Sequence, residues 1–209
     1  MAHSTDAPAQ FTVRPLGADD LEEAARILCE GFLNDPVWGP AFPEHPARRE
    51  HALAHWRFMV DQAIRHGEPL VAVLPDGSIG AVSTWFPPGA DEVHEDDAPA
   101  YESLLRSTIG GAAADALLSE GELFAEARPT APHAYLSMLA VAPEARGLGI
   151  GMGLVAAALE RYDEAGLQTY LESSNPANDA RYERIGYVPA KQVAIPGSPT
   201  VQTYLRVAG

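Results

Sequence analysis

The chain has 209 residues, of which 46% are apolar, enough for the core of one globular domain. Acidic residues outnumber basic ones by 29 to 14, and the formal net charge of −15 argues against nucleic-acid binding and favours cationic partners. Cys29 is the only cysteine, which excludes internal disulfides. Residues 1–10 lack the basic and apolar parts of a secretory signal, and no apolar run is long enough for a membrane helix. We expect a cytoplasmic protein with a disordered tail at 1–10 and a single domain at 11–209.

The first 127 residues show helix and strand patterns separated by turn residues. Spacing of apolar residues and turn signals predict these elements in chain order: a strand at 11–14, a helix from 19 to 35, a segment rich in proline and aromatic residues at 34–46, a helix at 46–66, a hairpin with strands at 70–74 and 79–86, an acidic loop at 91–97, and two helices within 99–127 that divide near 110.

The remaining residues alternate strands with helices. The predicted elements are a strand at 133–141, a helix from 149 to 164, a strand at 168–173, a short helix at 179–185, and strands at 187–195 and 200–207. Strands and helices in this order predict an α+β fold, a mixed α/β domain around one sheet.

The glycine-rich segment after strand 133–141 is the most informative. Glycines at 147, 149 and 151 stand where the next helix begins, and Arg146 precedes them. Glycine lets the backbone approach a ligand, and the free N–H groups of a helix N-terminus favour an anion. The segment predicts a pyrophosphate site; a glycine-rich helix start without a ligand is the alternative. Its G-x-G-x-G spacing departs from the Rossmann fingerprint, and no G-K-[S/T] sequence exists for a Walker loop.

Two segments resemble the GNAT superfamily of N-acetyltransferases. Arg146-Gly-Leu-Gly-Ile-Gly151, after Leu-Ala-Val-x-Pro, is similar to its acetyl-CoA loop, R/Q-x-x-G-x-G/A. Asn175, followed by Tyr182-Glu-Arg-Ile-Gly-Tyr187, resembles its second signature. Several segments also resemble the puromycin N-acetyltransferase-like group, although residues 88–130 match it thinly. The resemblance implies a single, mostly antiparallel central sheet with splayed strands and helices on both faces.

The resemblance also implies an activity and a donor. It implies transfer of acetyl from acetyl-CoA to the primary amine of a small molecule, by direct attack in a ternary complex, with the pantetheine arm between strands 133–141 and 168–173. It assigns the following residues to acetyl-CoA: Leu139, Ala140, Val141, Arg146, Gly147, Leu148, Gly149, Ile150, Gly151, Asn175, Asn178 and Tyr182. For Asn175 and Asn178, capping of the next helix is the alternative.

The match to the family tyrosine makes Tyr182 the candidate acid that protonates the leaving thiolate; a packing aromatic is the alternative. Glu172, at the end of strand 168–173, is the candidate base, although an outward-pointing glutamate is more often solvated. His133 and Tyr135, on the first splayed strand, are the alternatives. Some family members place a carboxylate on the first splayed strand, where this chain has Tyr135, Leu136 and Ser137. That departure favours deprotonation of the amine through water.

Four residues are candidates for acceptor binding. Asp35, Trp38 and Phe42 combine one carboxylate with aromatic surface, as recognition of an apolar cation requires. Trp85 would add a wall to the pocket, and burial in the core is an equally good interpretation of it. We therefore expect an amphipathic amine, such as an amino-nucleoside.

Other functions remain open at this stage. An acetyltransferase acting on protein or peptide amines and a catalytically silent coenzyme A sensor would show the same coenzyme signature. His51 and His55 have the spacing of metal ligands on a helix, but the chain has no H-E-x-x-H motif and no evident third ligand, so we expect no metal. The oligomeric state, monomer or homodimer, is not determined by these patterns.

Overall fold

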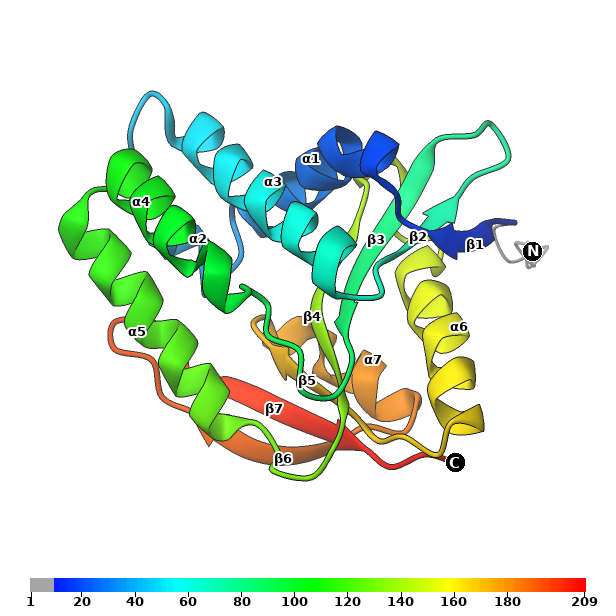
Figure 1. Cartoon of the computed structure of the whole chain (residues 1–209). Coiled ribbons are helices and arrows are strands. Elements are labelled where there is room, and N and C mark those ends of the chain that lie inside the picture. The colour runs from blue at the N-terminus through cyan, green and yellow to red at the C-terminus, as the bar shows by residue number, and fades with distance from the viewer. Residues whose placement is uncertain (1–9) are drawn as a thin grey trace, which may run out of the picture.

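The computed structural model describes residues 10–209 and contains one seven-stranded sheet (Figure 1). The prediction for residues 1–10 therefore lies, except for Gln10, outside the described residues. The strands are β1 (Thr12–Pro15), β2 (Leu70–Val73), β3 (Ile79–Phe86), β4 (Ala134–Val141), β5 (Thr169–Ser173), β6 (Val188–Val193) and β7 (Val201–Arg206). Their order is β1-β2-β3-β4-β5-β7-β6, and every neighbouring pair is antiparallel except β4 and β5. The predicted mixed α/β fold with a mostly antiparallel sheet is confirmed.

The helices follow the predicted order. They are α1 (Leu21–Phe32), α2 (Trp38–Ala41), α3 (Arg48–His66), α4 (Ala98–Ile109), α5 (Gly111–Ala127), α6 (Ile150–Glu164) and α7 (Asp179–Arg184). The short α2 was not predicted; it lies within the segment 34–46. Gly110, which has a φ of 81°, joins α4 to α5 at the predicted position.

Helices cover both faces of the sheet. Helices α1 and α3 pack on one face, against β3 and β4, and α6 packs on the other (Figure 1). Successive strand residues point to opposite faces. Accordingly Ala140 lies against Gly31 of α1, whereas its neighbour Val141 lies against Gly151 of α6. All eight residues of β3 are buried, because this strand has a helix on each side.

The parallel pair β4–β5 is short, and the two strands then separate. Pairing covers only Ala134 to Leu136 on β4. At the same point β4 has a bulge: Trp85 pairs with Leu136 and Thr84 with Met138, which leaves Ser137 without a partner on β3. From Ser137 onward, β4 therefore has an open edge that faces the gap between the strands. This is the predicted splay.

The α4–α5 hairpin flanks this gap. Helix α4 packs against α3, α5 packs against β6, and the pair stands beside the main body of the fold (Figure 1). In the part of the chain that the structure describes, no helix combines the length and apolar character needed to cross a membrane.

Candidate active site

The glycines before α6 serve two different purposes. Gly147 and Gly149 have φ angles of 81° and 75°, in the left-handed region that favours glycine, and the space around both is open. Gly151 is different, because a Cβ there would lie 2.7 Å from Cγ2 of Val141. It lets α6 pack closely on β4. Two glycines therefore shape the turn, and the third sets the distance between helix and sheet.

The turn presents backbone donors to a cleft. Within residues 10–209, the N–H groups of 147–152 donate no hydrogen bond to the protein. A cleft of about 690 Å³ runs along the turn, and the side chains of Arg146, Arg181 and Arg184 line it. Free N–H groups, the positive end of a helix and guanidinium groups together suit a phosphate-bearing ligand. Leu148 does not line the cleft, and its side chain is 50% exposed.

The open edge of β4 offers fewer backbone groups than the sequence predicts. Ala142 donates to the carbonyl of Gly80 on β3, and hydrogen-bonding direction alternates along a strand, so the groups of Ala140 also face β3. Leu139 and Val141 face the gap, where the Val141 carbonyl accepts from Nε of Arg146 at 3.3 Å. Ala140 lines the cleft, but its backbone groups are engaged with β3, and Leu139 has the free groups nearest the splay.

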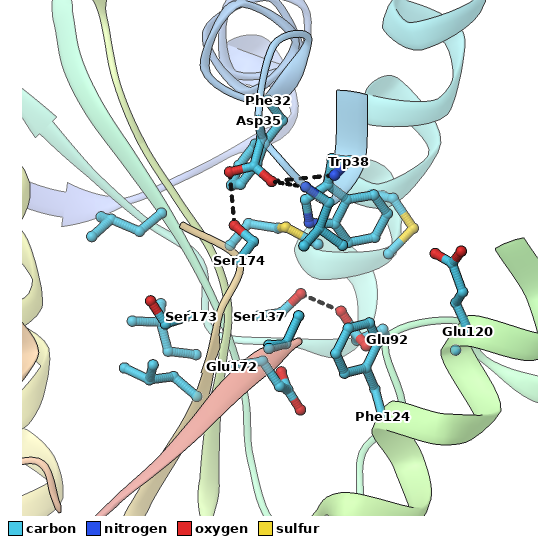
Figure 2. Close-up of a pocket in the computed structure, with 18 of the residues that line it drawn as sticks. Phe32, Asp35, Trp38, Glu92, Glu120, Phe124, Ser137, Glu172, Ser173 and Ser174 are labelled. Carbon is cyan, nitrogen blue, oxygen red and sulfur yellow. Dashed lines mark hydrogen bonds between the residues drawn. The ribbon is translucent and has the colours of Figure 1, made fainter. Parts of the chain in front are cut away.

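A second cavity, of about 250 Å³, lies on the other side of the gap between α1, α5, β4 and β5 (Figure 2). Six residues line both cavities: Gly31, Asp35, Leu139, Asn175, Asn178 and Tyr182. The cleft and the pocket therefore meet where β4 and β5 separate. A donor in the cleft and an acceptor in the pocket would come together at this junction.

Tyr182 lies at the junction. Helix α7 holds it, and its ring packs against the rings of Tyr187 and Tyr204, so the side chain is 8% exposed. Burial raises its pKa to about 12, which keeps the phenol protonated at neutral pH. Asn175 caps the turn before α7 by accepting from the N–H of Ala177, and Asn178 accepts from Arg181. Both asparagines thus support the helix that positions Tyr182.

Glu172 is buried at the wall of the pocket. Burial raises its pKa to about 7, although the nearby Arg128 opposes this shift. Nε of Arg128 is 4.0 Å from Oε1 of Glu172, and that oxygen accepts no hydrogen bond within residues 10–209. Arg128 also pairs with Glu92 at 2.6 Å, and Glu92 accepts from Ser137 (Figure 2). The result is a buried carboxylate poised to exchange a proton near neutral pH.

Sequence reasoning missed three residues that line the pocket, Glu92, Glu120 and Ser137, and also Arg128, which pairs with Glu92. Three of these four lie in the segment 88–130, where the family resemblance is thin. Arg128, which directly follows α5, has its guanidinium 4.0 Å from the centre of the Tyr135 ring. Ser137 lies at the β4 bulge, and a bulge of this kind leaves no mark in the apolar pattern. The acidic loop 91–97 also contributes to the site, because Glu92 lines the pocket.

The predicted acceptor residues divide into two pairs. Asp35 and Trp38 line the pocket, but the Asp35 carboxylate already accepts from the N–H groups of Val37 and Trp38 and from the Ser174 hydroxyl (Figure 2). Phe42 and Trp85 are 2% and 0% exposed, and neither lines the pocket. Neither residue forms part of the pocket wall, and for Trp85 the alternative interpretation, burial in the core, is the one that the structure supports.

Each of these two aromatic rings has a place in the core. Phe42 packs edge-on against His55, and Trp85 packs against Tyr162 of α6. The indole N–H of Trp85 donates to Ser83.

The histidines with metal-ligand spacing do not form a site. His55 is 1% exposed among aromatic rings, and burial lowers its pKa to about 3. His51 instead stacks on His45, with ring centres 5.5 Å apart. The spacing of four reflects one buried and one peripheral position on α3.

Comparison with known proteins agrees with this geometry. The model of the acetyltransferase (GNAT) family matches residues 33–187, and the chain belongs to this family of N-acetyltransferases, which use acetyl-CoA as donor. The fold is similar to that of a protein described as histone acetyltransferase HPA2 and related acetyltransferase from Corynebacterium glutamicum, with a TM-score of 0.76, 24% identity and coverage of 95% of this chain and 97% of that one.

Two other solved structures share the fold at lower identity. One is named arylalkylamine N-acetyltransferase 2 from Aedes aegypti, with a TM-score of 0.63, 11% identity and coverage of 96% of this chain and 100% of that one. The other is the ribosomal-protein-S18-alanine N-acetyltransferase from Escherichia coli, with a TM-score of 0.56, 15% identity and coverage of 96% and 95%. Their names span small-molecule and protein acceptors.

Proposed function

We propose that this enzyme transfers acetyl from acetyl-CoA to the primary amine of a compact, amphipathic small molecule in a ternary complex. The observation that carries the proposal is the junction of the two cavities, where Leu139 and Tyr182 line both. The cleft has the donors that suit a pyrophosphate, and the pocket has the buried carboxylate Glu172. Holding both reactants at one junction makes the attack effectively unimolecular.

The fit of the cleft to acetyl-CoA rests on its chemistry. The N–H groups of residues 147–152 and the guanidinium of Arg146 would hold the pyrophosphate. The open edge of β4 would bind the pantetheine arm as an added strand does, through Leu139 and Val141. The N–H of Leu139 would then stabilise the negative charge that develops on the thioester oxygen.

Glu172 is the proposed base. A substrate ammonium must lose a proton before its nitrogen can attack, and a carboxylate with a pKa of about 7 is half ionised at neutral pH. The new C–N bond forms as the C–S bond breaks. Of the two protons that the ammonium gives up, one ends on the coenzyme sulfur and the other passes to solvent.

Tyr182 is the proposed donor to the sulfur. Its pKa of about 12 lies above the value of about 8.5 for an alkyl thiol. Complete transfer of its proton to the thiolate is therefore uphill by itself. We assign to Tyr182 a hydrogen bond that stabilises the leaving thiolate. Its proton passes to the sulfur as Tyr182 takes up a proton from the substrate nitrogen, so the phenol ends protonated.

The acceptor is proposed from the shape of the pocket. Phe32, Trp38, Tyr101 and Phe124 supply aromatic surface, and carboxylates supply attraction for a cation. A volume of about 250 Å³ is slightly below the roughly 300 Å³ typical of drug-sized ligands, which favours a compact amine. The arylalkylamine name of one structural neighbour agrees with such an acceptor. The resemblance to the puromycin N-acetyltransferase-like group makes an amino-nucleoside a second acceptor to test.

A protein amine is the alternative acceptor, motivated by the name of the Escherichia coli neighbour. An extended peptide requires a groove that is open at both ends, whereas the α4–α5 hairpin and the segment 32–38 enclose this pocket. A silent coenzyme sensor would not need the buried carboxylate of Glu172 in the pocket that Tyr182 also lines. Both observations favour the small-molecule enzyme.

The experiment is an acetyl-transfer screen with release of free thiol as the readout. The panel contains arylalkylamines, aliphatic amines, an amino-nucleoside, and peptides with free α-amines or lysines. We expect the highest kcat/KM with a compact arylalkylamine. Faster acetylation of a peptide than of every small amine would refute the proposed acceptor class, and binding of acetyl-CoA without transfer to any amine would indicate a sensor.

A further inference from the structure

We infer that the preferred acceptor is a diamine, whose second cationic group binds Glu120 of α5 at the end of the pocket opposite β5. The inference rests on the proposed function, because it concerns the acceptor of the same pocket. It adds a specificity-determining residue that takes no part in the reaction at the junction.

Four carboxylates line the pocket, and three of them have partners. Asp35 accepts hydrogen bonds from its own loop and from Ser174. Glu92 pairs with Arg128, which also faces Glu172. Glu120 accepts no hydrogen bond and forms no ion pair with any residue from 10 to 209. An unpartnered carboxylate in a confined site is what a cationic ligand would neutralise.

The position of Glu120 on its helix makes it part of the pocket wall. Leu117, Glu120 and Phe124 are three and four residues apart, so they share one face of α5, and all three line the pocket. The neighbouring Glu122 and Glu126 are exposed on other faces of the helix. Glu120 is half-buried, and burial raises the pKa of its carboxyl group. The helix therefore directs one of its acidic side chains into the pocket. Partial burial of this carboxylate is unfavourable, and a bound cation would offset the lost solvation.

The two ends of the pocket are distinct. Figure 2 shows Glu120 projecting from α5, on the opposite side of the pocket from Ser173 and Ser174 of the β5 end. The reacting amine belongs at the β5 end, where the pocket meets the cleft at Tyr182. Aromatic and apolar surface from Trp38 and Phe124 lies in the pocket wall between these ends. This arrangement suits two ammonium groups joined by a short aromatic or apolar spacer.

The test compares two acceptors of the same shape. Para-xylylenediamine carries a second ammonium group where para-ethylbenzylamine carries a methyl group. We expect kcat/KM for the diamine to exceed that for the monoamine by about tenfold or more, the usual contribution of a hydrogen bond to a charged group. Glu120→Gln should remove most of this preference through KM for the diamine. Glu122→Gln, a matched change on the exposed face, should keep it.

Charge reversal and a binding measurement make the outcome decisive. Glu120→Lys should reject the diamine and favour para-(aminomethyl)benzoate, whose carboxylate replaces the second ammonium. Calorimetry with coenzyme A present measures the affinity of both amines without turnover. Glu120-dependent binding of the diamine without acetylation would support Glu120 as the binding site of the second cation and refute the proposed function. Equal affinity of the wild-type enzyme for diamine and monoamine, or a preference that survives Glu120→Gln, would overturn the inference.

Discussion

Glu172 shows how one residue gains its reactivity from its surroundings. It follows the last β5 residue that pairs with β4, so the splay exposes it to the pocket while the sheet and Tyr135 keep it away from solvent. Burial disfavours its charge, and Arg128, whose own charge is shared with Glu92, only partly restores it. A carboxyl group with a pKa of about 7 is the result.

We predict that Glu172→Gln lowers kcat/KM for a small amine by roughly 10²-fold. In the wild-type enzyme the rate should rise with pH through about 7, because only ionised Glu172 accepts a proton. The variant should lose this limb of the pH profile. Rates at several pH values check the prediction, with the exposed Glu126→Gln as control. A limb near pH 7 that persists in Glu172→Gln would assign the base to another group or to water.

The same variant has a signature in stability. The folded-state pKa of Glu172 is raised from 4.5 to about 7, so its stabilising contribution is complete below pH 4.5 and is lost as pH rises through 7. Relative to the wild type, Glu172→Gln should gain up to about 3 kcal/mol above pH 7 and little at pH 4.5. Thermal unfolding at both pH values measures this difference and separates loss of activity from loss of folding.

Tyr182→Phe tests the donor to the leaving sulfur. The ring packing on Tyr187 and Tyr204 is preserved, so affinity for acetyl-CoA should be unchanged, while kcat should fall by roughly 10²-fold. Steady-state kinetics and calorimetry with the coenzyme check the two parts separately. An unchanged kcat would leave Tyr182 with a packing role only.

At the scale of elements, the turn before α6 and the bulge in β4 create the site together. The turn aims backbone N–H groups at the cleft, and the bulge at Ser137 coincides with the end of the β4–β5 pair. Gly147 and Gly149 are required in this turn because of their φ angles. The strain of a side chain in that conformation, rather than a clash, is what a substitution would introduce.

We predict that Gly149→Ala abolishes the stabilisation of the protein by acetyl-CoA. A positive φ of 75° disfavours alanine, so the turn should rearrange and its N–H groups should no longer converge. Gly166→Ala is the matched control, because Gly166 has a φ of 64° and open surroundings at the other end of α6. Both variants should lose some stability, but only Gly166→Ala should keep the thermal shift with saturating acetyl-CoA. A full shift in Gly149→Ala would contradict the assigned role of the turn.

The elements and the site were predictable to different degrees. Local patterns predict the strands, the helices and the glycine turn, because turn residues and apolar spacing act over a few positions. The pocket wall is different, since Glu92 and Glu120, which line the pocket, and Arg128, which pairs with Glu92, reach the site only through the packing of the α4–α5 hairpin. The sequence leaves pocket wall and core open for Trp85 because β3 is buried on both faces, so no alternation shows which way an aromatic side chain points.

At the scale of the whole molecule, the net charge of −15 acts on both reactants. It attracts a protonated amine toward the acidic pocket and repels an anionic coenzyme. The cleft offsets the repulsion of the coenzyme locally, because the cationic side chains of Arg146, Arg181 and Arg184 line it. The local charge is therefore opposite in sign to the net charge at the cleft and the same in sign at the pocket.

We predict that kcat/KM for para-methylbenzylamine falls several-fold between about 20 and 300 mM salt, because the Debye length drops well below the size of the molecule. An arylamine such as para-toluidine is neutral at pH 7 and should show a much smaller slope. Initial rates at constant pH and saturating acetyl-CoA check this. Equal slopes for the two amines would mean that the acidic surface serves solubility and does not steer the substrate.

The two cavities come from separate stretches of the chain, and this has a consequence for how the enzyme can diversify. The cleft is built mainly from residues 139–184, whereas the outer wall of the pocket comes from 32–38 and from the α4–α5 hairpin. Replacing residues 92–124 would therefore exchange the acceptor while leaving the donor machinery in place. A chimaera that carries this hairpin from another GNAT enzyme should acquire the amine specificity of that enzyme. The segment is therefore a suitable target for directed evolution of acceptor specificity.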